Sequence, residues 1–138
     1  MTPTPNYPPS KILVIDDAII DNWIFKLLLK RAEKDSNITT CLNGKTAIDK
    51  LRKLKSEDKT AMPEYIFVDI TMPTMNGWEF LNEYIKLNVD CLEQSKVYIL
   101  TSSLFKSDYD KSLSYPFLKG YIRKPLSLNK VNEVFGIA

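Results

Sequence analysis

The sequence predicts an α/β protein in which helices cover both faces of one parallel sheet, an arrangement called doubly wound. Short apolar runs alternate along the chain with longer segments of helical periodicity, five of each. The runs at residues 12–15, 65–68 and 97–100 are apolar at every position, as in strands buried on both faces. Right-handed crossovers between such strands give a doubly wound sheet.

The first half of the chain predicts three strands separated by two helices. Residues 11–15 form the first strand, residues 38–42 the second and residues 65–68 the third. In the first helix we expect the apolar residues, Trp23 among them, to face the core and the charged ones to face solvent. The expected buried positions of the two helices are Ile20, Trp23, Ile24, Leu27 and Leu28, and then Ala47, Ile48, Leu51 and Leu54.

The second half predicts three helices and two strands. Residues 97–100 and 118–122 form the fourth and fifth strands, and residues 105–115 between them have no clear period. Pro116 predicts a short or irregular fourth helix. A helix after Pro73 and Gly77 is expected to bury Trp78, Leu81, Tyr84 and Ile85, and the closing helix Leu128, Val131, Val134 and Phe135.

Length and composition fit one domain. The chain has 138 residues, of which 44% are hydrophobic and 26% charged, and these are globular values. A proline-rich segment, residues 1–10, is predicted to be an arm that precedes the domain at 11–138.

Histidine is absent from the sequence, which excludes any mechanism that needs an imidazole from this chain. Cys41 and Cys91 form neither a metal pair nor a disulfide framework, so we expect inert thiols.

Net charge and the length of the apolar runs argue against nucleic acid and membrane as partners. A net charge of +2 with no long basic run argues against nucleic acid. The apolar runs are far shorter than the roughly 20 residues that cross a bilayer, and the first ten residues lack the pattern of a secretory signal. The expectation is a cytoplasmic protein that binds neither nucleic acid nor membrane.

Polar residues follow the apolar runs where the predicted strands end. Asp16 and Asp17 follow the first strand, Asp69 the third and Thr101 the fourth, and Lys124 comes just after the fifth. In an open α/β sheet, ligands bind outside the carboxyl ends of the strands. If these strands are neighbours, the five side chains converge on one patch.

Three carboxylates in one patch need positive charge nearby. Each pair at 4 Å repels by about 1 kcal/mol in water and by about 4 kcal/mol at an effective dielectric constant of 20. Lys124 supplies one positive charge, and a divalent cation would supply two more. Oxygen ligands of this kind suit Mg²⁺, which favours phosphate oxygens as further ligands. The Thr101 hydroxyl and the Lys124 ammonium can then hold phosphoryl oxygens, so the patch has the parts that phosphoryl transfer requires.

Together these segments resemble the receiver domain of two-component response regulators, a fold that chemotaxis regulators also have. The resemblance covers about residues 11–137. It implies a flavodoxin-like sheet of five strands in the order 2-1-3-4-5. The segments that carry it are Ile15-Asp16-Asp17, Val68-Asp69-Ile70-Thr71-Met72-Pro73 with Asn76-Gly77, Leu100-Thr101-Ser102, and Tyr121-Ile122-Arg123-Lys124-Pro125.

The resemblance implies a role for each of these residues. Asp69 is the expected phosphoacceptor, which becomes 4-aspartylphosphate. The expected Mg²⁺ site consists of Asp17 as direct ligand, Asp16 holding the water shell, Asp69, and the backbone carbonyl of Thr71. Thr101 bonds a phosphoryl oxygen, Lys124 pairs with the phosphoryl group, Lys124-Pro125 is a cis peptide, and Tyr121 is an aromatic switch coupled to Thr101.

The implied function is that of a single-domain response regulator. A sensor histidine kinase or a histidine phosphotransfer protein would donate the phosphoryl group to Asp69. The face formed by the fourth helix, fifth strand and fifth helix would then change. The segment after Lys124 has room for one helix, so we expect the output to be contact with a downstream protein or onward phosphotransfer. Such a protein is a switch rather than an enzyme, catalysing only its own phosphorylation and dephosphorylation.

Two alternatives remain open. A phosphohydrolase of the haloacid-dehalogenase type also uses an aspartate nucleophile with Mg²⁺, but it needs an acid/base two residues after the nucleophile. Ala18 and Thr71 stand at the two positions where that residue would be. A pseudo-receiver would keep the fold as an interaction module without being phosphorylated. The unbroken set of site residues argues against this loss of function.

Overall fold

Five parallel strands form one sheet in the order β2-β1-β3-β4-β5, as the sequence predicts. The structure is a computed structural model that describes residues 9–72, 74–90 and 92–137. The predicted arm therefore lies mostly outside the described residues, as do Pro73 and Cys91, while Ser10 already pairs with Ser36 in the sheet. The strands are β1 (Ser10–Ile15), β2 (Ser36–Cys41), β3 (Tyr65–Val68), β4 (Lys96–Thr101) and β5 (Leu118–Arg123).

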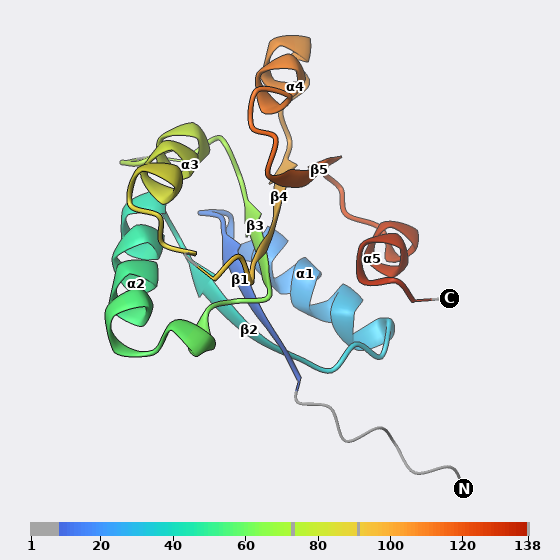
Figure 1. Cartoon of the computed structure of the whole chain (residues 1–138). Coiled ribbons are helices and arrows are strands. Elements are labelled where there is room, and N and C mark those ends of the chain that lie inside the picture. The colour runs from blue at the N-terminus through green and yellow to red at the C-terminus, as the bar shows by residue number, and fades with distance from the viewer. Residues whose placement is uncertain (1–8, 73, 91, 138) are drawn as a thin grey trace, which may run out of the picture.

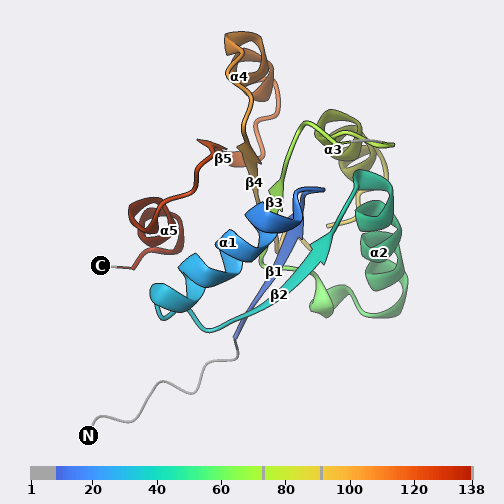
Figure 2. The ribbon, with the colours of Figure 1, turned by 180° about the vertical axis from the view of Figure 1, so that it is seen from behind.

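Helices cover both faces of the sheet (Figure 1). Helices α1 and α5 pack on one face around Phe25, Leu29 and Val131, and α2 and α3 pack on the other around Leu51 and Leu81. The short helix α4 stands apart from both layers, beyond the ends of β4 and β5 (Figure 2). The helices are α1 (Ile19–Arg31), α2 (Gly44–Glu57), the 3-10 turn η1 (Lys59–Ala61), α3 (Gly77–Lys86), α4 (Lys106–Ser112) and α5 (Leu128–Phe135).

The register of the central strands brings their carboxyl ends to one level. Ile15 at the end of β1 is paired with Val68 at the end of β3, and Val68 is paired with Ile99 in β4. All four residues of β3 are buried, which is why the strand sequence is apolar at every position. Asp16 and Asp69 follow β1 and β3 directly and Thr101 is the last residue of β4, so these polar residues meet at one edge.

The buried face of α1 differs from the predicted one. Asn22, Phe25 and Leu29 face the sheet, whereas Trp23, expected in the core, is 61% exposed. The helix is apolar on both sides, so periodicity alone could not show which side packs. The Asn22 side-chain amide donates a hydrogen bond to the Asp16 carbonyl oxygen and fixes the rotation of the helix. The other predicted core positions that are exposed are Ile20, Ile24 and Leu27.

The remaining helices are closer to the prediction. α3 buries Trp78, Leu81 and Tyr84 as expected, but Ile85 is exposed. α4 has seven residues and ends before Pro116, which confirms the short fourth helix. Cys41 is buried and is a free thiol among the described residues. Within the described part of the chain, no helix combines the length and apolar character needed to cross a membrane.

Candidate functional site

Three aspartates meet at the carboxyl edge of the sheet. Asp16, Asp17 and Asp69 each place one carboxylate oxygen within 4.8 Å of the others. Asp16 and Asp69 are buried, while Asp17 reaches solvent. Buried carboxylates at such separations repel strongly, so the cluster requires a compensating cation.

Lys124 supplies a positive charge at the centre of this cluster. Its Nζ lies 2.5 Å from Asp16 Oδ2, 2.9 Å from Asp21 Oδ2 and 3.1 Å from Asp69 Oδ2. The three carboxylates therefore take all three donor hydrogens of the ammonium. The backbone holds the residue in place as well, because the Lys124 N–H donates to the Thr101 carbonyl oxygen at 2.8 Å. The Lys124-Pro125 peptide that follows is cis, as the resemblance implies.

The surroundings raise both the pKa of the Asp16 carboxyl and the pKa of the Lys124 ammonium. Burial raises the pKa of the Asp16 carboxyl, and the hydrogen bond from Lys124 opposes that effect without cancelling it. Burial lowers the pKa of the Lys124 ammonium, but hydrogen bonds to Asp16 and Asp21 outweigh it and leave that pKa above its usual range. The cluster thus holds its single internal cation firmly and still has an excess of negative charge.

The two oxygens of Asp69 have different partners. Oδ1 accepts hydrogen bonds from the Thr71 backbone N–H and from the Thr101 hydroxyl, both at 3.0 Å. Oδ2 faces Lys124. One carboxylate is thereby fixed in orientation by groups from two strand ends and by the loop that follows β3.

A glycine allows the loop after β3 to fold back against the site. A Cβ atom on Gly77 would stand 2.4 Å from the Asp69 carbonyl oxygen and 2.6 Å from the Ile70 Cα. These neighbours are backbone atoms, so they could give way only if the loop itself shifted. Asn76 caps α3 at this point through a reciprocal capping box with Glu79. Gly77 therefore lets the chain approach the backbone of Asp69 closely, and Asn76 starts helix α3.

Tyr121 lies on β5 beside α4. Its hydroxyl oxygen is buried and has no hydrogen-bond partner among the described residues, and burial raises its pKa. The ring meets Tyr109 of α4 edge to face, with centroids 5.5 Å apart. Ser103 lies between this region and the site, since its N–H donates to the Thr101 hydroxyl oxygen at 3.2 Å and its hydroxyl donates to the Asp108 carboxylate.

Sequence reasoning missed Asp21, the third carboxylate on Lys124. From the sequence, Asp21 is one of the charged residues of the first helix that we expect to face solvent. Its position in the first turn of α1, directly after Asp16 and Asp17, is the signal that could have identified it, because that turn begins at the same edge of the sheet. Asp21 is partly exposed and can respond to groups that approach from solvent.

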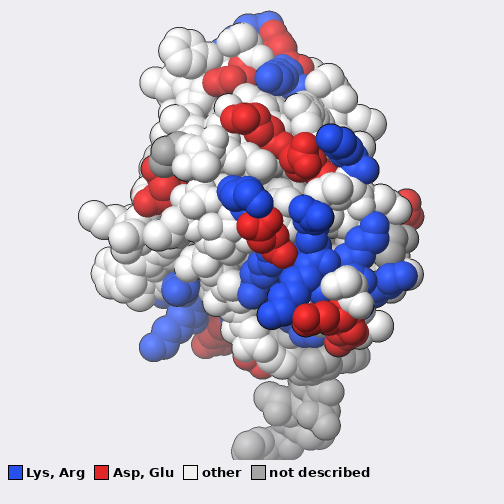
Figure 3. Space-filling model, turned by 90° about the vertical axis from the view of Figure 1, so that its left-hand side faces the viewer, with Lys and Arg blue, Asp and Glu red and all other residues white. Residues whose placement is uncertain are grey.

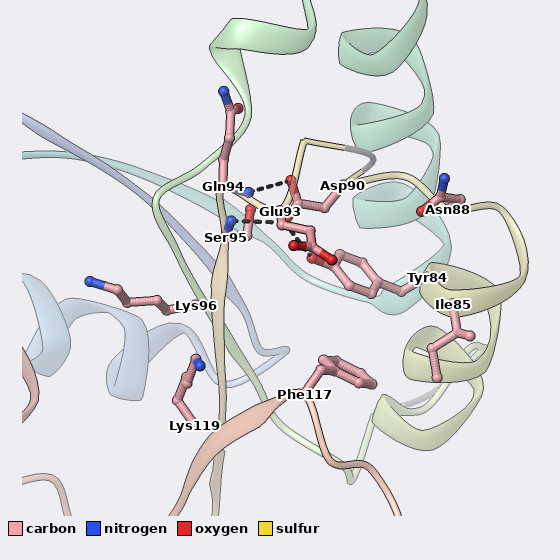
Figure 4. A pocket seen from close by; sticks show the side chains of 10 residues that line it. All are labelled: Tyr84, Ile85, Asn88, Asp90, Glu93, Gln94, Ser95, Lys96, Phe117 and Lys119. Atoms are coloured by element: carbon pink, nitrogen blue, oxygen red, sulfur yellow. Dashed lines mark hydrogen bonds between the residues drawn. The ribbon is translucent and has the colours of Figure 1, made fainter.

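Two other surface features do not form comparable sites. A hollow of about 660 Å³ lies where β4 and β5 begin, at the opposite edge of the sheet (Figure 4). The Asp90 carboxylate in it already binds the backbone N–H groups of Gln94 and Ser95, so it serves the loop. Basic side chains also gather over the α2 side of the molecule (Figure 3), where Lys50 and Arg52 are exposed near acidic residues of the same helix.

Comparison with known proteins identifies the family to which the fold belongs. A family model described as "Response regulator receiver domain" matches residues 12–135. The chain therefore belongs to the response regulator receiver family. Among solved structures, a two-component response regulator from Cytophaga hutchinsonii is similar, with 29% identity, a TM-score of 0.82 and coverage of 94% of this chain and 96% of that one.

Curated relatives point to the same family. Response regulator Rcp1 of Synechocystis is 30% identical over 73% of this chain and 67% of its own length. Chemotaxis protein CheY of Thermotoga maritima is 30% identical over 56% of this chain and 58% of its own. A protein-glutamate methylesterase/protein-glutamine glutaminase of Clostridium acetobutylicum is 31% identical over 89% of this chain, which spans only 34% of that protein.

The donor set fits the ion that receiver domains generally bind. Receiver domains hold Mg²⁺ in an acidic pocket, and here the pocket consists of Asp16, Asp17 and Asp69. The candidate ligand atoms are all carboxylate oxygens, which suit a hard cation. Lys124 neutralises only part of the charge, and exposed Asp17 leaves one side of the cluster open to solvent.

Proposed function

We propose that this protein is a response regulator in which Asp69 accepts a phosphoryl group from a phosphohistidine donor, in a reaction that requires Mg²⁺. The observation that carries the proposal is the position of Asp69, which is buried at a strand end between Lys124, Thr101 and two further carboxylates. A carboxylate that served only as a helix cap would not need a lysine from the far end of the chain beside it.

The proposed reaction forms one bond and breaks another. An oxygen of the Asp69 carboxylate forms a bond to phosphorus, while the bond between phosphorus and the donor's imidazole nitrogen breaks. The bonding electron pair leaves with the imidazole. Negative charge on the three outer phosphoryl oxygens has to be stabilised throughout the transfer.

Residues of this chain account for much of that stabilisation. Lys124 lies 3.1 Å from Asp69 Oδ2, so its ammonium is already where a phosphoryl oxygen would arrive. The Thr101 hydroxyl, 3.0 Å from Asp69 Oδ1, can donate to a phosphoryl oxygen in place of the carboxylate. Thr71 holds the same Asp69 oxygen through its N–H and keeps the carboxylate oriented.

The metal ligands are part of the same proposal. Asp17, Asp16 and Asp69, with the backbone carbonyl of Thr71, would hold Mg²⁺. The bound ion would supply neutralising charge for the carboxylates and for the phosphoryl oxygens.

Phosphorylation would then change the surface near α4. A phosphoryl group adds about two negative charges and three acceptor oxygens. A Thr101 hydroxyl drawn to that group would leave Asp69, and the Ser103 N–H that now binds this hydroxyl would follow. Tyr121 is the side chain proposed to report the change, since its hydroxyl has no partner among the described residues and its ring contacts α4.

The proposed partners are a sensor histidine kinase or histidine phosphotransfer protein on the input side and a downstream protein on the output side, in the cytoplasm. Among the curated relatives is one named sensor histidine kinase CheAY, from Helicobacter pylori. The single-domain organisation stays a prediction.

Beryllofluoride, which mimics a phosphoryl group on a carboxylate, tests this function. With Mg²⁺ present, we expect it to raise the melting temperature of the protein and to change its tryptophan fluorescence. The Asp69→Asn variant should show neither change. A response of equal size in that variant would assign the effect to another carboxylate, and no response in the wild type would favour the pseudo-receiver alternative.

A further inference from the structure

The solvent side of α2 and η1 is rich in basic side chains (Figure 3). Residues 44–60 contain six of the 19 Lys and Arg residues of the chain but only three of its 17 Asp and Glu residues. Because the net charge of the whole chain is only +2, the excess of positive charge is concentrated in this segment. We call this surface the α2 basic face, and its exposed members are Lys45, Lys50, Arg52, Lys53 and Lys59.

The helix macrodipole does not account for these charges. It favours basic side chains in the last turn of a helix and acidic side chains in the first turn. Lys45, however, stands in the first turn of α2, which holds no acidic residue. Lys50 and Lys53 are three positions apart on one side of the helix, so they repel each other. An anionic partner would neutralise this repulsion.

Two of the three acidic residues in the same segment are already bound by other groups. Asp49 forms an ion pair with Lys45 at 2.7 Å. Asp58 accepts hydrogen bonds from the backbone N–H and the hydroxyl of Thr60 in η1. The members of the α2 basic face that have no ion-pair partner among the described residues are Lys50, Arg52, Lys53 and Lys59. These cations can therefore bind a partner without breaking an existing ion pair.

A hollow of about 270 Å³ lies beside this face, between α2 and the edge strand β2. Lys50 lines it from α2 and Lys11 lines it from the start of β1. Asn37 and Thr39 of β2 add polar groups, and Leu54 of α2 adds apolar surface. The lining thus combines positive charge, hydrogen-bonding groups and apolar surface in one place next to the edge of the sheet.

Strand β2 has an unprotected outer edge. It pairs only with β1, in a register without a bulge, and its sequence includes no lysine, arginine or proline that would block a further strand. The Cys41 carbonyl oxygen accepts a hydrogen bond from the Asp16 N–H, on the β1 side. Since alternate residues of a parallel strand direct their backbone groups to opposite sides, Ile38 and Thr40 direct theirs away from β1.

We propose that the α2 basic face and the outer edge of β2 together bind an extended acidic segment of a partner protein, which adds to the sheet beside β2. Successive side chains of a strand point to opposite faces of the sheet. On the α2 side they meet Lys50 and Lys53, which favour acidic residues. On the other side they meet Ile38 and Thr40, beside which β-branched residues pack well. The segment that fits alternates acidic and β-branched residues.

A peptide fits these observations better than a nucleic acid or a membrane. Single-stranded nucleic acids gain affinity by stacking bases on aromatic side chains, and residues 44–60 include none. A helix that binds a membrane inserts its apolar side, but the apolar residues Ala47, Ile48 and Leu51 of α2 are buried in the core. Neither partner would use the backbone groups of β2, whereas a peptide strand pairs with them.

The proposed docking surface is separate from the phosphoacceptor cluster. Lys11 stands near the start of β1, whereas Asp16 follows the end of that strand. The proposal therefore goes beyond the phosphoacceptor chemistry. Peptide binding and phosphorylation of Asp69 can be measured independently, so failure of one does not decide the other.

Fluorescence anisotropy with a labelled peptide that alternates glutamate and threonine tests the charge requirement on the full chain. The wild type should bind this peptide and should not bind a peptide with lysine in place of glutamate. The double variant Lys50→Glu, Lys53→Glu should raise the dissociation constant at least about tenfold. Lys26→Glu, Lys30→Glu on α1 is the matched control, because it reverses two exposed charges elsewhere and should bind like the wild type. Circular dichroism shows whether both variants remain folded.

Amide hydrogen exchange measured by NMR tests where the peptide lies. The bound peptide should slow exchange at Ile38 and Thr40 and leave exchange at Thr39, whose N–H points toward β1, unchanged. A wild type that does not bind the peptide, or that binds it without this protection, would overturn the proposal. Equal weakening in the two double variants would also overturn it. Binding of duplex DNA or of phosphatidylserine vesicles in place of the peptide, lost in Lys50→Glu, Lys53→Glu, would assign the face to that partner instead.

Discussion

The Lys124 ammonium lies 3.1 Å from Asp69 Oδ2, although the two residues are 55 positions apart in the sequence. The contact exists because both residues stand at the carboxyl edge of one parallel sheet. Lys124 follows β5, two strands away from β3, and its side chain is long enough to reach Asp69 and Asp16 together. The phosphoacceptor proposal depends on this contact.

The Asp16→Asn variant should be more stable than the wild type at neutral pH. Burial raises the pKa of Asp16 in the folded protein. A carboxyl whose pKa is higher in the folded than in the unfolded protein costs no stability while it is protonated in both states. The free energy of unfolding then falls as the pH rises above the pKa of the unfolded state. Asparagine carries no charge, so its advantage should grow between pH 4.5 and pH 7.5, measured by urea denaturation. An advantage that shrinks over this interval would contradict the burial argument, and Asp110→Asn on the surface is the control.

Mg²⁺ should stabilise the wild type and should stabilise Asp17→Asn much less. An ion that binds only the folded protein adds about 2.7 kcal/mol when its concentration is a hundred times its dissociation constant. Thermal melts with increasing Mg²⁺ measure the effect, and a chelator should reverse it. Equal stabilisation of both proteins would place the ion away from the Asp16, Asp17 and Asp69 cluster.

Thr101→Val should lower the free energy of unfolding by about 1–3 kcal/mol, because it removes a buried hydrogen-bonding group. The Thr101 hydroxyl donates to Asp69 and accepts from the Ser103 N–H, and valine can do neither. Thr101→Ser keeps the hydroxyl and should recover most of the loss. Chemical denaturation of the three proteins makes the comparison, and a serine variant as unstable as the valine variant would show that the methyl group matters instead.

Gly77→Ala should destabilise the fold by roughly 1–3 kcal/mol through overpacking. The added methyl would meet backbone atoms of Asp69 and Ile70, so the loop after β3 has to shift. Gly120→Ala is a milder control, since its Cβ would meet only the Tyr98 side chain at 3.1 Å. The two melting temperatures give the test, and an equal effect in both variants would contradict the tight approach at Gly77.

The sheet could be predicted from sequence because its signals are local and unambiguous. β3 is apolar at every position and ends at an aspartate, and its predicted bounds are those observed. The face of α1 could not be predicted, since Trp23 and Phe25 are equally apolar and only the contacts made by Asn22 and Phe25 decide which side packs. Asp21 was missed for a related reason, because its role depends on Lys124 approaching from another part of the chain.

Intact mass after incubation with acetyl phosphate and Mg²⁺ tests the central claim most directly. The wild type should gain one phosphoryl group, and the adduct should be absent from Asp69→Asn and from a sample with chelator. Asp110→Asn, which alters an exposed aspartate on α4, should be modified like the wild type. An adduct that persists in Asp69→Asn, or a wild type that gains none, would contradict the assignment of Asp69 as the phosphoacceptor.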